Sequence, residues 1–338
     1  MPLFVASFSA LLAACSGQSA NPAGEAGGGG GGSAASAGTS TGSGLGDCPP
    51  SEVCLNAPEN GMQIESVGEV IQPGEDVEYC EVLQLPGDPS ETYYVNRFEV
   101  GMAQHSHHLI VAAAIPGSET EKAMTLGMKK KCLGPDVFGG EINSVTGSQH
   151  PYHEETFPEG VGKVFHGGQY LIFDYHYLNT SSAPVQARAA VNFHTVDASQ
   201  VKRVARSFGF YNFGIDIPAM SKASFTDKCH FSHDLMVHKV TRHTHKLGRD
   251  FSVAFAGGTR DGEHIWTSPN YEDTEYAFDE PVLMPAGTGF EFTCDFDNPT
   301  TEPVKFGVKA DDEMCILFGS WYVANVGDEV PSQGCDVF

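Results

Sequence analysis

Two histidines separated by one residue are the first feature of this sequence that could carry out chemistry. His243 and His245 stand in the run 242–248, which reads RHTHKLG. The surrounding stretch 235–255 is rich in β-branched, aromatic and aliphatic residues in partial alternation, which predicts a β-strand. Residues i and i+2 of a strand project from one face, so the two imidazoles would form half of a metal site. An isolated His-x-His is equally typical of two exposed polar strand residues.

A second histidine cluster precedes an apolar strand. Residues 105–108 read HSHH and lead into Leu109 and the residues that follow. Strand parity pairs His105 with His107 on one face. It sends His107 and His108 to opposite faces unless the strand is bulged or only just begins.

Two further segments contain possible ligands. Residues 174–177 read DYHY, and residues 311–315 read DDEMC. Parity places Asp174 on the face of His176, where its carboxylate could orient an imidazole. Taken alone, His176 is more typical of an ordinary strand histidine, and Met314 of core packing.

The elements that must position these residues are predicted to be strands. Eight stretches have strand composition and are separated by Pro and Gly clusters: 79–85, 93–100, 108–115, 169–178, 186–194, 239–255, 282–296 and 304–309. One short helix is expected within 119–131. Short strands at this spacing predict an all-β fold of the sandwich or jelly-roll type. A boundary near 197–200 would divide it into two antiparallel, jelly-roll-like β-sandwich domains in tandem, 47–198 and 199–338, each with a histidine strand.

The N-terminal region is expected to lie outside the folded part. Residues 12–15 read LAAC and resemble a bacterial lipobox, which predicts a lipoprotein signal peptide over 1–15 and a lipidated Cys15. The start lacks the basic residues typical of such a signal, and a disordered apolar tail is the alternative. Residues 16–46 are rich in Gly and Ser and predict a flexible tether. The protein is therefore expected to be exported and lipid-anchored, in the outer membrane or periplasm or on the surface of a bacterium, with membrane contact through the anchor only.

Charge and cysteine content narrow the class of protein. The 338 residues include 43 Asp and Glu against 19 Lys and Arg, giving a net charge of −24, which argues against nucleic-acid binding. Apart from Cys15, eight cysteines remain. An even number in an exported chain predicts disulfides, although spacing cannot choose among the many possible pairings. The sequence has no C-x-x-C pair, so a zinc ribbon is not indicated.

Taken together, the four segments resemble one family, the copper type II, ascorbate-dependent monooxygenases, which includes peptidylglycine α-hydroxylating monooxygenase and dopamine β-monooxygenase. The resemblance covers roughly 76–322. It is carried by four motifs in the same order: His-His at 107–108, His-Tyr at 176–177, HTHKLG at 243–248 and Glu-Met-Cys at 313–315. It implies two antiparallel β-sandwich domains, each holding one copper, separated by a solvent-filled cleft.

The resemblance also implies a role for each ligand. The first copper would be bound by His107, His108 and His176, and would supply an electron. The second would be bound by His243, His245 and Met314, and would bind dioxygen and attack a substrate C–H bond; these three are the expected catalytic residues. A thioether suits Cu(I) and argues against zinc. His105 remains a candidate substitute or supporting ligand.

Cysteine pairing follows from the same resemblance. The implied disulfides are Cys80–Cys132, Cys294–Cys315 and Cys229–Cys335, which leaves Cys48–Cys54.

The sequence departs from the family at the substrate site. Peptide-amidating members bind the substrate carboxylate with an Arg, an Asn and a Tyr at positions that here hold Thr241, Ile316 and Phe318. We therefore do not expect a peptide with a C-terminal glycine as substrate, and we expect a more apolar pocket.

The leading prediction is a copper-dependent monooxygenase with two coppers per chain. It would hydroxylate a C–H bond of a small-molecule or peptide substrate, using O2 and ascorbate or another one-electron reductant. The alternative is a non-catalytic lipoprotein that binds or buffers copper with the same ligands. A zinc hydrolase built on His-x-His is disfavoured because no general base can be assigned to it.

Overall fold

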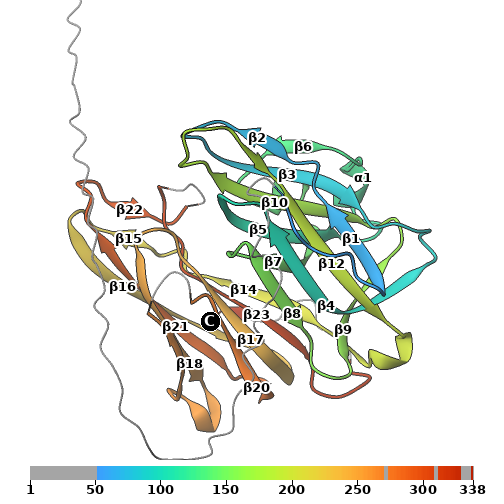
Figure 1. The fold of residues 1–338 in the computed structure, drawn as a ribbon. Coiled ribbons are helices and arrows are strands. Elements are labelled where there is room, and N and C mark those ends of the chain that lie inside the picture. The colour runs from blue at the N-terminus through green and yellow to red at the C-terminus, as the bar shows by residue number, and fades with distance from the viewer. Residues whose placement is uncertain (1–51, 270–272, 308–310, 329–335, 338) are drawn as a thin grey trace, which may run out of the picture. The chain divides into compact units, whose positions relative to one another are not determined.

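A computed structural model describes residues 52–269, 273–307, 311–328 and 336–337, and these belong to one compact unit (Figure 1). The predicted signal peptide, Cys15, the tether 16–46, Cys48 and Cys335 lie outside the described residues. None of the helices in the described ranges is long and apolar enough to span a membrane.

The first half of the described chain forms two main sheets. The six-stranded sheet has the order β1 (Gly61–Glu65), β12 (Ala189–Val196), β4 (Thr92–Met102), β9 (Val161–His166), β13 (Arg203–Val204), with β8 (Tyr152–Thr156) paired to β4. The five-stranded sheet has the order β6 (Lys129–Lys131), β3 (Asp76–Gln84), β10 (Tyr170–Leu178), β5 (Ser106–Ala114), β7 (Ile142–Ser148). A small sheet pairs β11 (Val185–Ala187) with β2 (Glu69–Ile71).

The second half repeats this arrangement of two main sheets and one small sheet. The four-stranded sheet has the order β14 (Arg206–Tyr211), β23 (Ile316–Val323), β17 (Leu235–His243), β20 (Glu275–Met284). The five-stranded sheet has the order β19 (His264–Ser268), β18 (Gly248–Ala256), β21 (Gly289–Asn298), β16 (Ser221–His230), β24 (Asp336–Val337). The small sheet pairs β15 (Asp216–Ile217) with β22 (Val304–Lys305).

Helical structure is slight in the described residues. It comprises α1 (Glu119–Ala123) and three 3₁₀ turns, η1 (Pro135–Phe138), η2 (Ala198–Gln200) and η3 (Gly258–Arg260). All the strand pairs described above are antiparallel except β13 with β9. The all-β prediction is therefore confirmed, whereas the jelly-roll description and the division at 198/199 remain predictions.

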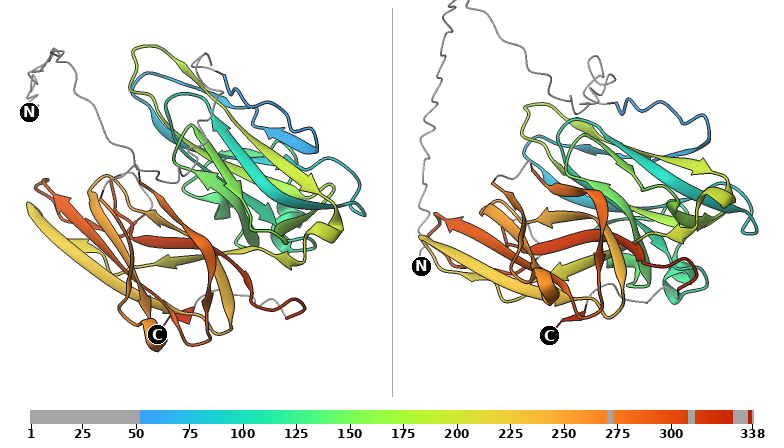
Figure 2. Two further views of the ribbon diagram at one scale, coloured as in Figure 1. Left: turned by 60° about the horizontal axis from the view of Figure 1, so that its bottom comes forward. Right: turned by 90° about the horizontal axis from the view of Figure 1, so that it is seen from below.

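Among the described residues, two main apolar cores follow the two halves of the chain, apart from Tyr322, which belongs to the first core. The first lies between the two main sheets of the first half; Phe98 packs there against Phe157, Phe165 and Phe193 in T-shaped contacts with centroid distances of 6.1, 6.2 and 5.1 Å. Such edge-to-face pairs contribute about 0.5–1.5 kcal/mol each beyond the burial of their area. The second core is formed by apolar side chains from the two main sheets of the second half, drawn in yellow to red in Figure 2. Alternate residues of β3, β5 and β10 form a third, smaller buried cluster, which includes Val82, Ala112 and Ile172.

Some predicted elements have different boundaries. The predicted strand 239–255 is two strands, β17 and β18, because residues 244–247 turn between them. The predicted strand 282–296 divides at Pro285–Gly287 into β20 and β21. The expected helix is only α1, capped by the Ser118 side chain, and the lysines that follow pair with β3 instead. Several strands with weak apolar alternation, β16 among them, were not predicted.

Candidate metal centre

A β-bulge brings the first two histidines together. His176 on β10 pairs with His108, but the next residue, Tyr177, pairs with Ser106, so the pairing passes over His107. An extra residue in one strand bends it and re-aims the side chains. His107 and His108 therefore reach the same site, although simple parity would separate them. His105 precedes the strand at a φ of 70° and is not a member of this cluster.

His107, His108 and His176 form a compact set. One ring nitrogen of each lies within 4.8 Å of those of the other two. The ring centroids are 4.9 to 5.4 Å apart, and the Nδ1 atoms of His107 and His108 are 3.1 Å apart. Three converging imidazoles have the donor atoms and spacing that a bound metal requires.

The imidazoles of this set are held neutral. Burial lowers the pKa of His107 to about 4, and the neighbouring imidazole of His176 adds to this. Burial lowers the pKa of His108 well below its ordinary value, again with His176 contributing. A neutral imidazole offers a lone pair at pH 7, so no proton has to be displaced before a metal binds.

Three carboxyl groups that flank the set have distinct positions. Asp76 accepts a hydrogen bond from the Nε2 of His176, which leaves Nδ1 of that ring as the free donor atom. Glu78 and Asp174 each have an oxygen within 4.8 Å of a ring nitrogen of His108. Burial raises the pKa of both carboxyl groups, and the Glu78 carboxylate further raises that of Asp174. The structure thus places Asp76 on His176, and Asp174 nearer to His108.

His243 and His245 also lie together, although only the first is in a strand. β17 ends at His243, and the two rings have a centroid distance of 5.2 Å. Burial lowers the pKa of His243 to about 3, with a contribution from the His245 imidazole, and burial also lowers the pKa of His245. The predicted proximity is present, but a turn produces it rather than strand parity.

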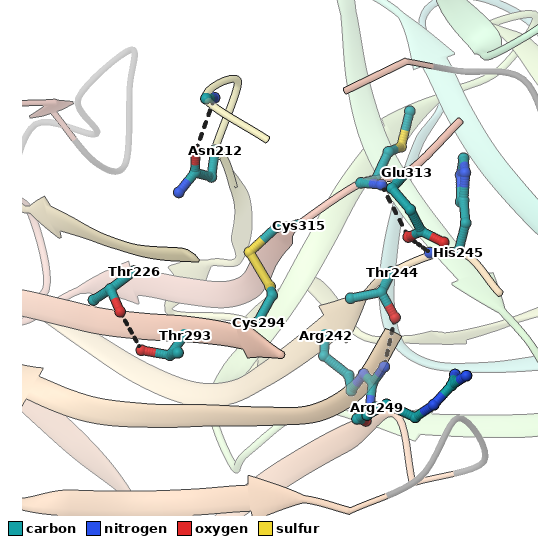
Figure 3. The surroundings of a disulfide bond; sticks show 12 residues. Asn212, Thr226, Arg242, Thr244, His245, Arg249, Thr293, Cys294, Glu313 and Cys315 are labelled. Atoms are coloured by element: carbon teal, nitrogen blue, oxygen red, sulfur yellow. Dashed lines mark hydrogen bonds between the residues drawn. A yellow bond between two sulfur atoms is a disulfide. The ribbon is translucent and has the colours of Figure 1, made fainter. Parts of the chain in front are cut away.

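Glu313 fixes the turn that carries His245. Its buried carboxyl group accepts a hydrogen bond from the backbone N–H of His245 at 2.9 Å (Figure 3). It also accepts one from the backbone N–H of Leu247 at 2.6 Å. The Nδ1–H of His245 donates to the backbone carbonyl of Asp312 at 2.9 Å. Since Nδ1 is engaged in this bond, Nε2 is the nitrogen left to bind a metal.

Met314 belongs to the segment that holds His245. It follows Glu313 directly, is half-buried, and its own N–H lies 3.4 Å from the Glu313 carboxyl group. Cys315 then forms a disulfide with Cys294 on β21 (Figure 3). The bond ties this segment to the second core and limits the motion of Met314.

Both histidine sets line one cavity of about 440 Å³. Its walls include His107, His108 and His176 from the first set, and His243 and His245 from the second. The shared cavity allows both sets to meet the same solvent and the same small molecules.

A second cavity of about 190 Å³ lies against the face of the four-stranded sheet that carries His243. Thr241 and Phe318, which are cross-strand partners, line it together with His108 and His243. Ile316 pairs with His243 and is 2% exposed. Arg242 points to the opposite face, where it is buried and its guanidinium donates to Thr244 and Ser268. No arginine stands at the Thr241 position to bind a carboxylate.

The predicted disulfides are present where the structure describes both cysteines. These are Cys80–Cys132 and Cys294–Cys315. Cys54 and Cys229 are also disulfide-bonded, and their predicted partners lie outside the described residues.

Sequence reasoning assigned no supporting role to four residues, Asp76, Glu78, Asp312 and Glu313, although the last two stand in the DDEMC segment that it singled out. The first two alternate along a strand whose start was placed three residues too late, and that alternation was the available signal. The last two belong to the same acidic run as Met314, but their bonds to His245 join positions more than 60 residues apart. Nothing local in the sequence encodes those bonds.

Comparison with known proteins supports the family suggested by the motifs. Residues 210–337 match the model of the copper type II ascorbate-dependent monooxygenase C-terminal domain. This match supports membership of that family and suggests copper-dependent hydroxylation. The comparison with curated proteins found no match.

The similarities to solved structures are remote. The chain is 9% identical to PNGF-II with a TM-score of 0.27, over 80% of this chain and 65% of that one. It is also 9% identical to PBCV-1 VP54, fitted into a cryo-EM reconstruction of the virophage Sputnik, with a TM-score of 0.23 over 83% and 94% of the two chains. TM-scores this low carry no argument about fold or function.

Proposed function

We propose that the protein is a two-copper monooxygenase that hydroxylates a substrate C–H bond with O2 and an external one-electron reductant such as ascorbate. One copper would be held by His107, His108 and His176, and the other by His243, His245 and Met314. The organisation into two β-sandwich domains, one for each copper, forms part of the proposal. The observation that carries it is the convergence of both histidine sets on one cavity, together with the family match over 210–337.

The donor atoms fit copper in both sets. Three neutral imidazoles serve Cu(I) and Cu(II), and a thioether with two imidazoles favours Cu(I). When bound, the two coppers would supply one-electron transfer and dioxygen chemistry. The overall reaction is balanced as RH + O2 + 2e⁻ + 2H⁺ → ROH + H2O, with the reductant as the source of the electrons.

The protein contributes the positions of the ligand histidines. Asp76 and the Asp312 carbonyl each bind one nitrogen of a ligand histidine, which fixes the ring and leaves the other nitrogen free. Glu313 holds the backbone of the turn on which His245 stands. His108 and His243 are half-buried, and both line the smaller cavity as well as the larger one.

The substrate is expected to approach over Thr241 and Phe318, which line the smaller cavity beside His243. Phe318 offers an apolar contact there, while Glu155, Lys163 and Lys239 add charged groups to the wall of the same cavity. Thr241 and Phe318 stand at two positions where this chain departs from the peptide-amidating pattern, and Ile316, the third, does not line this cavity.

The decisive experiment joins metal analysis to an oxygen-consumption screen. The purified full chain is loaded with copper, and oxygen uptake driven by ascorbate is followed with a panel of small apolar compounds and peptides. We expect two coppers per chain and substrate-stimulated uptake with a hydroxylated product. The variant His243→Ala/His245→Ala should retain one copper and lose turnover.

The same experiment separates the enzyme from a copper buffer. A buffer would also bind two coppers, but no organic compound would stimulate oxygen uptake or become hydroxylated. A wild type that retains zinc and rejects copper would exclude both readings.

A further inference from the structure

Two carboxyl groups, that of Glu78 half-buried and that of Asp174 buried, lie close to His108 of the first histidine set. The strand register places Glu78 on β3, His176 on β10 and His108 on β5 abreast of one another. Asp174 stands one same-face position further along β10 and is 0% exposed. One ligand atom each from Glu78, Asp174 and His108 lies within 4.8 Å of the others.

The two nitrogens of His108 have different surroundings. Nδ1 faces the histidine set, 3.1 Å from Nδ1 of His107. Nε2 is buried and has no hydrogen-bond partner among the described residues, and the same is true of Oδ2 of Asp174. A buried donor without an acceptor, close to a buried acceptor without a donor, costs free energy unless the two are used together.

Metal binding would settle which nitrogen carries the proton. A neutral imidazole has one N–H, and the nitrogen that binds a metal must present its lone pair. If Nδ1 of His108 binds the metal, the proton is on Nε2. A ring nitrogen of His108 lies within 4.8 Å of an oxygen of Glu78 and of Asp174. The other well-defined ligand rings follow the same plan, since His176 donates to Asp76 and His245 to the Asp312 carbonyl.

We propose that Glu78 and Asp174 are positioning residues for His108, which donates its Nε2–H to this carboxyl pair and thereby binds copper through Nδ1. The inference rests on the proposed function, because it requires copper at the first histidine set. The carboxyl pair also makes the imidazole a stronger donor and places negative charge near the metal. Both effects favour Cu(II) over Cu(I) and hold the reduction potential of this copper below the value it would have with a neutral partner.

The test isolates the first copper. The parent is the full-length protein with His243→Ala and His245→Ala, in which only the first copper site remains. Three variants of this parent are compared with it: Glu78→Gln, Asp174→Asn and the two substitutions together. The measurements are copper affinity by chelator competition, reduction potential by redox titration, and the Cu(II) electron paramagnetic resonance spectrum. Supporting residues of this kind change metal affinity by about 10- to 100-fold. We expect Cu(II) affinity to fall by this factor when Glu78→Gln and Asp174→Asn are combined. The reduction potential should rise and the Cu(II) spectrum should change in the same variant.

The matched control is Glu81→Gln. Glu81 is a neighbouring glutamate of β3, is 1% exposed, and accepts hydrogen bonds from Val67 N–H and the Tyr175 hydroxyl instead. Its substitution should affect folding without moving the potential. Glu78→Asp keeps the carboxyl group, so this variant should bind Cu(II) more tightly than Glu78→Gln does.

Three outcomes would overturn the inference. The Glu78→Gln/Asp174→Asn protein could bind Cu(II) with the same affinity and reduction potential as its His243→Ala/His245→Ala parent. Glu81→Gln could change the affinity and the potential as much as that pair of substitutions does. Metal analysis could also find a divalent ion bound to the Glu78 and Asp174 carboxyl groups themselves. A wild-type protein that binds no copper at all would instead remove the proposed function and the inference with it.

Discussion

Glu155, from the first half of the chain, forms a buried ion pair with Lys239, from the second half. Substitution of Glu155 tests how much this ion pair stabilises the fold. The carboxylate of Glu155, on β8, lies 2.9 Å from the ammonium group of Lys239 on β17, the strand that ends at His243. Both side chains are largely buried, at 8% and 14% exposure. Burial alone would raise the pKa of Glu155, but the ammonium groups of Lys239 and Lys163 outweigh it and hold the pKa at about 2.

The size of the effect follows from this pKa. The ordinary value is 4.5, and a depressed pKa adds stability that is fully present above the unfolded value and is lost as the pH falls through the folded one. A difference of about 2.5 units corresponds to about 3 kcal/mol. The ion pair should therefore contribute about 3 kcal/mol to the free energy of unfolding above pH 4.5, and this contribution should disappear towards pH 2.

The assay is urea unfolding of the metal-free protein between pH 7 and pH 2.5, for wild type and Glu155→Gln. At pH 7 the variant should be less stable than wild type by about 3 kcal/mol, which is at the lower end of the range for breaking a buried ion pair. The loss is not larger because Lys239 retains a second partner, the Glu275 carboxylate, at 3.4 Å. The difference in stability between the two proteins should shrink as the pH falls, because Glu155 becomes protonated in wild type and its ion pair is lost. The other acidic groups are the same in both proteins and therefore do not change this difference. If the two stability curves run parallel across the whole range, or coincide at pH 7, the reasoning is refuted.

Three further outcomes are expected. Met314→Ile removes the sulfur at a packing cost of about 1 kcal/mol and should abolish hydroxylation and weaken Cu(I) binding at the second site, whereas wild-type turnover in this variant would reduce Met314 to a core residue. Glu313→Ala leaves the backbone N–H groups of the His245 turn without their acceptor. Copper affinity at the second site should therefore fall by about 10- to 100-fold, while the first site should be unaffected. Equal loss of copper from both sites in metal titrations would contradict a local role for Glu313. Peptide mapping under non-reducing conditions should recover Cys294 joined to Cys315, and free thiols at these positions would count against the fold.

The sequence by itself determined the all-β class and drew attention to five of the histidines that the structure gathers around one cavity. Both depend on short-range patterns: alternating apolar residues predict strands, and motifs such as HTHKLG and Glu-Met-Cys identify residue types that suit copper. The substrate-site departures at Thr241, Ile316 and Phe318 were also readable in this way. A motif lists donor atoms, however, and does not state their geometry.

Only the tertiary structure decided how the ligands are held. The bulge that passes over His107 is a property of the pairing between β5 and β10, and it could not be chosen from the sequence of either strand. The turn at His245 depends on Glu313, 68 residues away, and the ring of His176 depends on Asp76, 100 residues away. The proximity of Glu78 and Asp174 to His108 requires three strands in one register. Local periodicity fixes which face a side chain takes, but register and long-range hydrogen bonds decide which side chains meet, and these are settled only when the sheets assemble.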